Sequence, residues 1–236
     1  MPAPPDAATE AGAAVYSPLV LKVYDAWVLG VSNRWAWRCP TRQVLLPFYR
    51  AHLGRRHLDV GVGTGFYLAH AGFGERHEVA LLDLNPTSLR TAARRMGRPH
   101  AGLIAADVLQ PAPALEDRRV DSIALFYLLH CLPGDMRAKA SVFANLARHL
   151  ADGGVLYGAT ILGDEAGHNR FGRRLMAIYN RKGIFGNRAD TRASLAQALG
   201  AHFHEVDVRV EGRVALFTAR APRPPAIGIL GTPSAA

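Results

Sequence analysis

Four residues near one apolar run have the types and spacing of a ligand-binding turn. Asp59 lies within the run, and Gly61, Gly63 and Gly65 follow it at alternate positions. Glycine tolerates positive φ and leaves room where a side chain would collide, so such a turn lets the backbone approach a ligand closely. The Gly-x-Gly-x-x-Gly turn that binds a pyrophosphate has another spacing, and Asp59 would repel a diphosphate. A carboxylate here could accept from an amino group, which favours a zwitterionic ligand without phosphate.

Two further acids follow predicted strands. Asp83 comes directly after the strand predicted over Glu78 to Leu82, and Asp107 comes after the strand predicted over Ala101 to Ala106. An ionised carboxylate only accepts hydrogen bonds, so each acid could bind hydroxyl or amine donors of a ligand. The alternative for Asp83 is a helix N-cap, although Asn85 is better placed for that cap. The alternative for Asp107 is a loop acid that satisfies turn amides.

His130 is the first candidate for a general base. It follows the strand predicted over Val120 to Leu128, and an ordinary histidine pKa of about 6.5 suits proton removal. The alternative is a structural histidine that bonds the loop before Pro133. His168 and Asn169 are second candidates for the base or for an acceptor contact. Cys131 is interpreted as a small buried filler rather than a nucleophile.

Strand-like and helix-like segments alternate along the chain after the glycine turn. Proline opens the second predicted helix, where its fixed φ suits the first turn. The order predicts an α/β fold: a Rossmann-like, doubly wound sheet of seven strands that ends in an antiparallel hairpin, with ligands at the carboxyl ends of the strands. Besides the segments already given, the predicted helices are Phe66 to Ala71, Thr87 to Met96 and Met136 to Leu150, and the predicted strands are Val155 to Leu162, His202 to Val210 and Arg213 to Ala219, with Asp152-Gly153-Gly154 as a turn.

The chain divides into one core and its additions. Residues 53–220 are predicted to form the core, with a helical insertion at about 165–186, and residues 14–52 a helical lid. Both additions are aromatic or amphipathic and would lie over the carboxyl end of the sheet. All three tryptophans precede the core, which favours a flat, apolar acceptor, although ordinary packing of a helix on the sheet remains open. Residues 1–13 and 221–236 are predicted to be disordered.

Bulk properties narrow the class of protein. With 236 residues and 49% apolar residues, the chain suits one globular domain with a lid. It has no apolar run long enough for a membrane span, no signal peptide and only two cysteines, so a cytoplasmic enzyme is expected. The net charge of +9 comes almost entirely from dispersed arginines. This pattern indicates a solvated surface rather than a nucleic-acid partner, and no metal-ligand spacing is present. The oligomeric state is left open, a homodimer included.

These motifs together resemble those of the class I S-adenosylmethionine (SAM)-dependent methyltransferases of the small-molecule type, related to the quinone-biosynthesis enzymes. The resemblance covers about Leu53 to Arg220. It rests on four motifs in order: Leu58-Asp59-Val60-Gly61-Val62-Gly63-Thr64-Gly65, then Asp83, then Asp107, then Asp121-Ser122-Ile123-Ala124-Leu125-Phe126-Tyr127-Leu128-Leu129-His130.

The resemblance implies a role for each motif. Asp83 would accept from both ribose hydroxyls, Asp107 from the adenine amine, and Asp59 from the amino group of the methionine moiety. The cofactor-binding residues would be Asp59, Gly61, Gly63, Thr64, Gly65, Asp83, Leu84, Asn85, Asp107, Val108, Phe126 and Tyr127. The substrate-binding residues would be Tyr16, Tyr24, Trp27, His130, Met176, Tyr179 and Asn180. The implied activity is methyl transfer to a small aromatic or flat apolar acceptor in specialised metabolism, with the product S-adenosylhomocysteine (SAH).

Several other functions stay open. A nucleic-acid methyltransferase would need an Asn/Asp-Pro-Pro-Tyr/Phe motif or a Pro-Cys dipeptide, and a protein-arginine methyltransferase would need two glutamates after the fourth strand; none of these is present. A nicotinamide oxidoreductase agrees with the fold but not with the glycine spacing. A non-catalytic SAM-binding partner subunit would need no acceptor pocket, whereas two aromatic segments imply one. The accepting atom, whether O, N or C, does not follow from the sequence.

Overall fold

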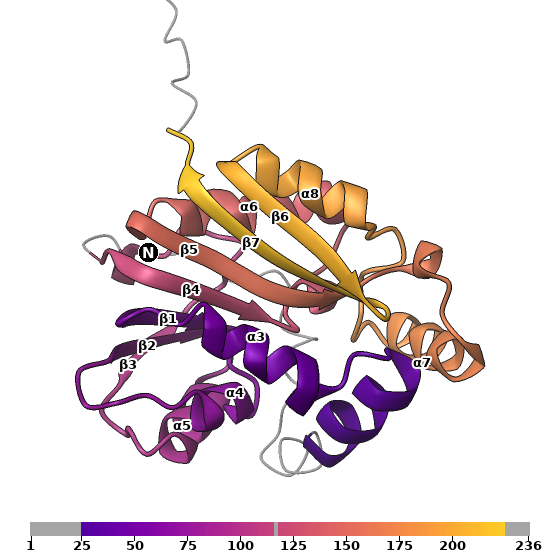
Figure 1. Cartoon of the computed structure of the whole chain (residues 1–236), viewed down its shortest axis with the longest axis horizontal. Helices are drawn as coiled ribbons and strands as arrows, with labels where there is room; N and C mark the ends of the chain where they lie inside the picture. Colours follow the sequence, from indigo (N-terminus) through magenta and orange to yellow (C-terminus); the bar gives the residue numbers. More distant parts are fainter. Residues whose placement is uncertain (1–24, 116–117, 225–236) are drawn as a thin grey trace, which may run out of the picture.

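The core of the protein is a single seven-stranded sheet (Figure 1). The computed structural model describes residues 25–115 and 118–224. The strand order is β3-β2-β1-β4-β5-β7-β6, and β7 pairs antiparallel with both β5 and β6, whereas the other pairs are parallel. This confirms the predicted Rossmann-like sheet with its antiparallel C-terminal hairpin. The strands are β1 (Arg56–Val60), β2 (Glu78–Asp83), β3 (Gly102–Ala105), β4 (Val120–Phe126), β5 (Leu150–Ile161), β6 (Phe203–Glu211) and β7 (Val214–Pro222).

Helices cover both faces of this sheet. In Figure 1, α3 crosses in front of the strands with α4 and α5 drawn below it, and α6 and α8 lie behind the strands. The apolar side chains of α6 and α8 join those of β1, β4 and β7 in one core, while the front helices form two further clusters. The helices are η1 (Asp25–Ala36) and η2 (Thr41–Leu45), both π-helical, α3 (Leu46–Ala51), α4 (Phe66–His70), α5 (Pro86–Arg95), α6 (Met136–Ala147), α7 (Arg170–Arg181) and α8 (Arg192–Gly200), with 3₁₀ turns η3 (Pro113–Leu115), η4 (Leu129–Cys131) and η5 (Asp164–Ala166).

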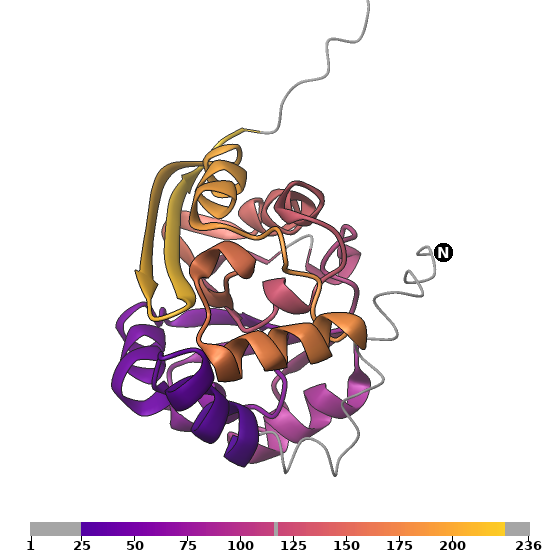
Figure 2. The same cartoon turned by 90° about the vertical axis from the view of Figure 1, so that its right-hand side faces the viewer.

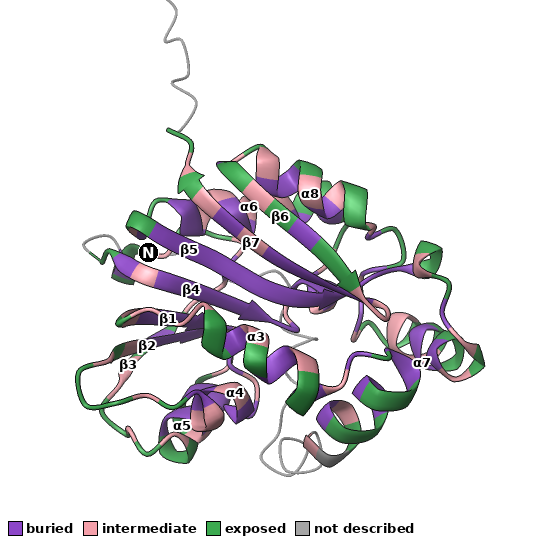
Figure 3. Cartoon of the chain, viewed as in Figure 1, coloured by how far each residue is buried: buried purple, intermediate pink, exposed green. Residues whose placement is uncertain are grey.

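Burial differs between the central and the edge strands in the way that the sequence predicts. Nearly every residue of β4, and all of β5 from Val155 on, is buried (Figure 3). Edge strand β6 is mostly exposed, and only Phe203 and Val208 along it are buried. Among the described residues, no helix combines the length and the apolar character that crossing a bilayer requires.

Two local features differ from the sequence prediction. The segment Asp152-Gly153-Gly154, predicted as a turn before the strand, lies within β5, where the pairing with β4 shifts register between Val120 and Ser122. Gly153 has a φ of 73°, which suits such an irregularity. Helix α8 was not predicted, although Thr191 and Ser194 form a capping box at its start. Strand β7 also continues to Pro222, past the expected end at Ala219.

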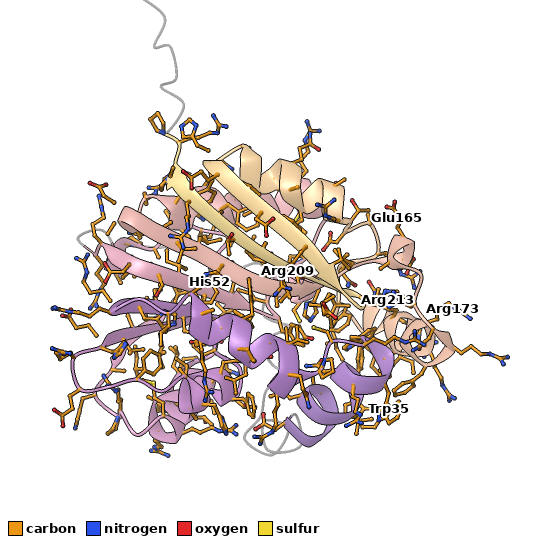
Figure 4. All side chains as sticks on the ribbon, viewed as in Figure 1. Trp35, His52, Glu165, Arg173, Arg209 and Arg213 are labelled. Carbon is orange, nitrogen blue, oxygen red and sulfur yellow. The ribbon has the colours of Figure 1, made fainter. Side chains whose placement is uncertain are left out.

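The two predicted cover segments meet each other. Figure 2 shows η1 and α7 side by side on the face turned to the viewer. Trp27 Nε1 donates to Tyr179 Oη at 2.9 Å, and the Trp27 ring lies edge-on to Phe171. Trp35 on η1 and Arg173 on α7 point outward at this end of the molecule (Figure 4). The expectations for residues 1–13, for Tyr16 and Tyr24, and for residues 225–236 lie outside the described residues.

A buried ion pair anchors the segment between α7 and α8. Lys139 of α6 donates to Asp190 at 2.5 Å and to the carbonyl of Gly186 at 2.9 Å, and both charged side chains are fully buried. Each charge offsets the cost of burying the other. The pair therefore attaches the segment that follows α7 to the rear helical layer.

Removing one partner of this pair is expected to destabilise the protein strongly. Lys139→Met leaves the Asp190 carboxylate buried without a counter-charge, which costs about 3–5 kcal/mol. The double variant Lys139→Met/Asp190→Leu has no uncompensated charge and should recover most of that loss. Urea unfolding followed by circular dichroism measures both. If the single variant were as stable as the wild type, the ion pair would not contribute to the free energy of unfolding.

Candidate functional site

One cavity lies at the carboxyl ends of β1, β2, β3 and β4. Its volume, open mouth included, is about 1050 Å³. It gathers most of the predicted cofactor-binding residues: Asp59, Gly61, Gly63, Thr64, Asp83, Leu84, Asp107, Val108, Phe126 and Tyr127. The other lining residues are Leu29, Val60, Val62, Phe66, Tyr67, Leu68, Leu82, Ser88, Ala106, Leu128, Cys131 and Leu132. Three carboxylates thus share one cavity with a largely apolar wall.

The glycine turn adopts the conformations for which glycine is suited. Gly61, Gly63 and Gly65 have φ values of 74°, 52° and 73°. A Cβ on Gly61 would lie 2.9 Å from Leu128, and one on Gly65 would lie 2.6 Å from the backbone of Ala92. A Cβ on Gly63 would meet nothing within 4 Å. Gly65 therefore serves the packing of α4 on α5 and does not line the cavity, whereas Gly61 and Gly63 form part of its wall.

The Asp83 carboxylate is held in place by backbone amides. It accepts from the amides of Val62, Gly63 and Asn85, the last at 2.8 Å. Burial raises the pKa of Asp83 to about 6, against the lowering effect of these three amides. Asn85 caps α5 by accepting from the Thr87 amide at 2.8 Å, and it does not line the cavity. Asp83 therefore presents a carboxylate that is positioned before any ligand binds.

Asp107 sits in a comparable turn beyond β3. Its Oδ1 accepts from the amide of Leu109 at 2.9 Å, and Asn145 of α6 donates to the carbonyl of Val108 at 3.0 Å. Asp107 can satisfy a turn amide and still bind a ligand, because the same side chain also lines the cavity. These bonds fix the part of the cavity wall that follows β3.

Asp59 is the terminus of a buried chain of polar side chains that sequence reasoning did not find. Tyr49 Oη donates to Asp59 Oδ2 at 2.6 Å and lies 3.0 Å from His57 Nε2. His57 Nδ1 lies 2.7 Å from Ser122 Oγ, which accepts from the Gly54 amide at 2.8 Å. The polar residues His57 and Ser122 within apolar strands could have indicated a buried hydrogen-bond network. The link through Tyr49 of α3, however, depends on the tertiary fold.

Helix η1 closes over the glycine turn. Thr64 Oγ1 donates to Asp25 Oδ1 at 2.7 Å, and Arg95 of α5 pairs with Asp25 Oδ2 at 2.5 Å. The Arg95 guanidinium also lies over the Phe66 ring, 5.6 Å from its centroid. Leu29, one turn into η1, reaches the cavity wall. Asp25 and Leu29 are thus site residues that sequence reasoning missed.

Tyr127 links the end of β4 to the same helix. Its φ of 61° is rare for a residue with a side chain, and such strain persists only where surrounding contacts hold it. Tyr127 Oη donates to Asn33 Oδ1 at 2.9 Å, and Asn33 Nδ2 donates to Thr41 Oγ1 at 2.8 Å. Thr41 in turn donates to the Leu29 carbonyl at 2.6 Å. This network links η1 to the strand end that borders the cavity.

His130 does not line the cavity. The ring is 2% exposed, its Nδ1 accepts from the Ile161 amide at 3.3 Å, and its edge meets the Phe185 ring at 4.6 Å. Burial, aided by the charge of Lys139, lowers the pKa of His130 to about 3. An imidazole with that pKa, and with Nδ1 already occupied, is a poor proton acceptor at neutral pH. The geometry favours the structural alternative for this histidine.

The second candidates have structural partners as well. His168 Nε2 lies 3.0 Å and 2.9 Å from the carbonyls of Leu162 and Gly163, and the ring lies edge-on to Trp37. Asn169 caps α7 through the Gly172 amide and donates to the Trp35 carbonyl at 2.8 Å. Both residues therefore connect α7 with the segments around it.

Of the predicted substrate residues that the structure describes, Trp27 lies on η1, and Met176, Tyr179 and Asn180 lie on α7; none of these four lines the cavity. Met176 is buried against Asn187, and Asn180 donates to the Met176 carbonyl and to Asn187. Trp27 and Tyr179 form the hydrogen bond that joins the two helices. Cys131, expected to be a buried filler, is partly exposed and lines the cavity.

The pKa of His130 gives a direct test of its environment. In the folded protein the imidazole should stay neutral from pH 8 to pH 5, because protonation would place an uncompensated charge in the interior. The unfolded histidine titrates near 6.5, so this group's contribution to stability is complete above that pH and is lost as the pH falls toward 3. A ¹⁵N NMR titration of labelled histidines measures it, with His130→Asn for assignment. A midpoint near 6.5 would contradict the buried, neutral ring.

Comparisons with known proteins place this geometry among methyl-transferring enzymes. Residues 58–156 match the family model described as "Methyltransferase domain". The chain is 50% identical over 192 residues to "Putative uncharacterized protein YbcY" of Escherichia coli (strain K12), covering 81% of this chain and 98% of that protein. It is 43% identical to "Physcion biosynthesis cluster O-methyltransferase" of Aspergillus chevalieri, covering 91% and 97%. The structure described as "DhpI-SAH complex structure" aligns with a TM-score of 0.63 at 18% identity, covering 91% and 98%.

Proposed function

This chain belongs to the class I SAM-dependent methyltransferases, and we propose that it methylates an oxygen atom of a small, flat, largely apolar acceptor. The enzyme class rests on relatives that align along nearly their whole length, and SAM is the cofactor. The observation that carries the proposal is a cavity in which three carboxylates face an apolar wall. Small-molecule methylation in specialised metabolism agrees with the fungal relatives.

The residues of the cavity fit SAM chemically. The cofactor's ribose hydroxyls, adenine amine and amino group are all donors, and Asp59, Asp83 and Asp107 are all acceptors. Gly63 has open space where a side chain would stand, so a ligand can lie against its backbone. The same carboxylates would repel a dinucleotide's diphosphate. The donor set therefore supports SAM over a nicotinamide cofactor.

We assign the carboxylates as the family resemblance implies. Asp83 would accept from the two ribose hydroxyls, and Asp107 would accept from the adenine amine. Asp59 would accept from the amino group, with Gly61 and Gly63 as the floor beneath the methionine moiety. Leu84 would pack against the adenine, and the backbone at Phe126 and Tyr127 would face the sulfonium. Carbonyl oxygens near a sulfonium are favourable because its methyl groups are polarised.

The acceptor's chemistry is inferred from the relatives and from the apolar wall. Two relatives that are 43% and 35% identical to this chain are named as O-methyltransferases. Leu29, Leu128, Cys131 and Leu132 line the cavity and would contact a flat apolar ring. SAM supplies an activated methyl group, so the protein's part is alignment and exclusion of water. Alignment alone can contribute about 7–11 kcal/mol. The acceptor oxygen would attack the methyl group as the phenolate, its proton having passed to water, and SAH would leave as a neutral thioether. This step does not use His130 as a base.

Parallel calorimetric titrations with SAM, SAH and NADH test the cofactor assignment. Micromolar binding of both sulfur ligands without an NADH signal is expected. The enzyme is then incubated with SAM carrying a labelled methyl group and a panel of phenols, naphthols, anilines and thiols. Label in the ether products supports the proposal. Label in the anilines alone would move the accepting atom to nitrogen.

SAH affinity should depend on the charge of Asp83. The ribose hydroxyls need the ionised carboxylate, and the pKa of Asp83 is about 6 in the unliganded protein. Affinity should therefore be constant above pH 7 and fall about tenfold per pH unit below pH 6. Calorimetry across pH 5–8 measures the slope. Asp83→Asn serves as the control, because the amide cannot titrate and the SAH affinity of this variant should not fall below pH 6.

Asp83→Ala should weaken SAH binding severely at every pH. Two charge-assisted hydrogen bonds are lost, each contributing about 1.5–3 kcal/mol. Calorimetry at pH 7.5 gives the affinity, and a thermal melt checks that the variant folds. Affinity close to that of the wild type would overturn the ribose assignment.

A further inference from the structure

The buried chain behind Asp59 has a function that the cofactor assignment alone does not explain. This series of hydrogen bonds begins just before β1 and passes through the interior to the cavity wall. Its members in order are Gly54, Ser122, His57, Tyr49 and Asp59. The side chains of Tyr49, His57 and Ser122 are fully buried, and Asp59 is 6% exposed. Because no bulk water competes inside the protein, such bonds are strong and orient their members.

Each bond in this chain has a defined direction. An ionised Asp59 can only accept, so the single hydroxyl proton of Tyr49 points at Asp59 Oδ2. The short contact between Tyr49 Oη and His57 Nε2 then requires that Nε2 carries the ring proton and donates it. When the ring carries only this proton, Nδ1 accepts, and Ser122 donates to it while accepting from the Gly54 amide.

The surroundings favour this arrangement of protons. Burial and the negative charge of Asp59 raise the pKa of Tyr49 well above its usual value, so Tyr49 keeps its proton and remains a donor. The titratable groups that face Asp59 come from several elements: His57 on its own strand, Tyr49 on α3, Tyr67 on α4, Asp83 on β2 and Tyr157 on β5. Apart from His57, none of these groups becomes a cation on titration.

We propose that Tyr49 is a positioning residue for cofactor binding: with His57 and Ser122 behind it, it holds the Asp59 carboxylate as an oriented acceptor for the amino group of SAM. This inference rests on the proposed role of Asp59. Tyr49 touches neither cofactor nor acceptor; it acts by fixing one carboxylate oxygen, which leaves the carboxylate plane little freedom to turn. The ligand therefore does not have to order Asp59 when it binds.

The test compares two tyrosines of the same aromatic cluster. Tyr49→Phe keeps the ring, which packs against Phe126 and Tyr67, and removes both hydrogen bonds of the hydroxyl. Tyr157→Phe is the matched control: its hydroxyl is equally buried but has no hydrogen-bond partner among the described residues. The two rings lie 5.8 Å apart, so both variants perturb the same region.

Ligand choice separates positioning from general destabilisation. SAH carries the amino group, whereas 5′-methylthioadenosine has the same nucleoside without it. Tyr49→Phe should weaken SAH about tenfold and leave 5′-methylthioadenosine within twofold of the wild type. Tyr157→Phe should change neither. Equal weakening of both ligands by Tyr49→Phe, or unchanged SAH affinity, would overturn the proposal.

A second measurement needs no ligand and no variant. The ¹⁵N shifts of the His57 ring in the unliganded protein report its tautomer, and the proposal requires the neutral form protonated at Nε2. Protonation at Nδ1 would reverse the chain, turn the Tyr49 hydroxyl toward His57 and overturn the inference. Failure of the wild type to bind SAH at all would instead contradict the proposed function, while the tautomer would still decide the direction of the chain.

Discussion

The close contact between the glycine turn and its neighbours is the constraint on which the rest of the site depends. The amides of Val62 and Gly63 bond Asp83 at the end of β2, so the turn also positions a carboxylate from the next strand. Gly65 lets α4 pack directly on Ala92 of α5. A side chain at Gly61 would collide with Leu128, which follows β4. One turn therefore holds three strand ends and a helix pair in register around the cavity.

Placing carboxylates in an apolar cavity has a cost, and the protein offsets it in two different ways. Asp83 receives backbone amides, yet burial still raises its pKa to about 6. Asp59 receives a side-chain hydroxyl at 2.6 Å, itself supported by His57 and Ser122. A cofactor with many hydrogen-bond donors would bond the remaining acceptor positions of both carboxylates. It would thereby offset the rest of the free-energy cost of burying them, because buried polar groups are stable only when they are hydrogen-bonded. The site is thus organised for donors before a ligand arrives.

The sequence was sufficient to predict local elements of structure, but it was insufficient to predict contacts between elements that are distant along the chain. Residue spacing, apolar runs and strand ends predicted the strand–turn–helix at Gly61, the acid at Asp83 and the burial of both faces of β4. The structure has each of these features. Helix α8 was missed because its residues have weak amphipathic character, although Thr191 and Ser194 cap its start. The Tyr49 bond to Asp59 joins residues of separate elements through the folded core, so no spacing rule indicates it. His130 was expected near a ligand from its place after β4, but the segment at Phe185 and Gly186 packs over that position.

Helix η1 is bound to the site at two points. Asp25 bonds Thr64 of the glycine turn and Arg95 of α5, while Asn33 bonds the strained Tyr127. Tyr127 has a positive φ, and its hydroxyl joins a network that runs through Asn33 and Thr41 to the Leu29 carbonyl. Such contacts hold a strained backbone in place. A ligand that moves either Thr64 or Tyr127 must therefore also move η1. Because Trp27 of η1 bonds Tyr179 of α7, both helices are linked through these contacts to the residues around the proposed cofactor site.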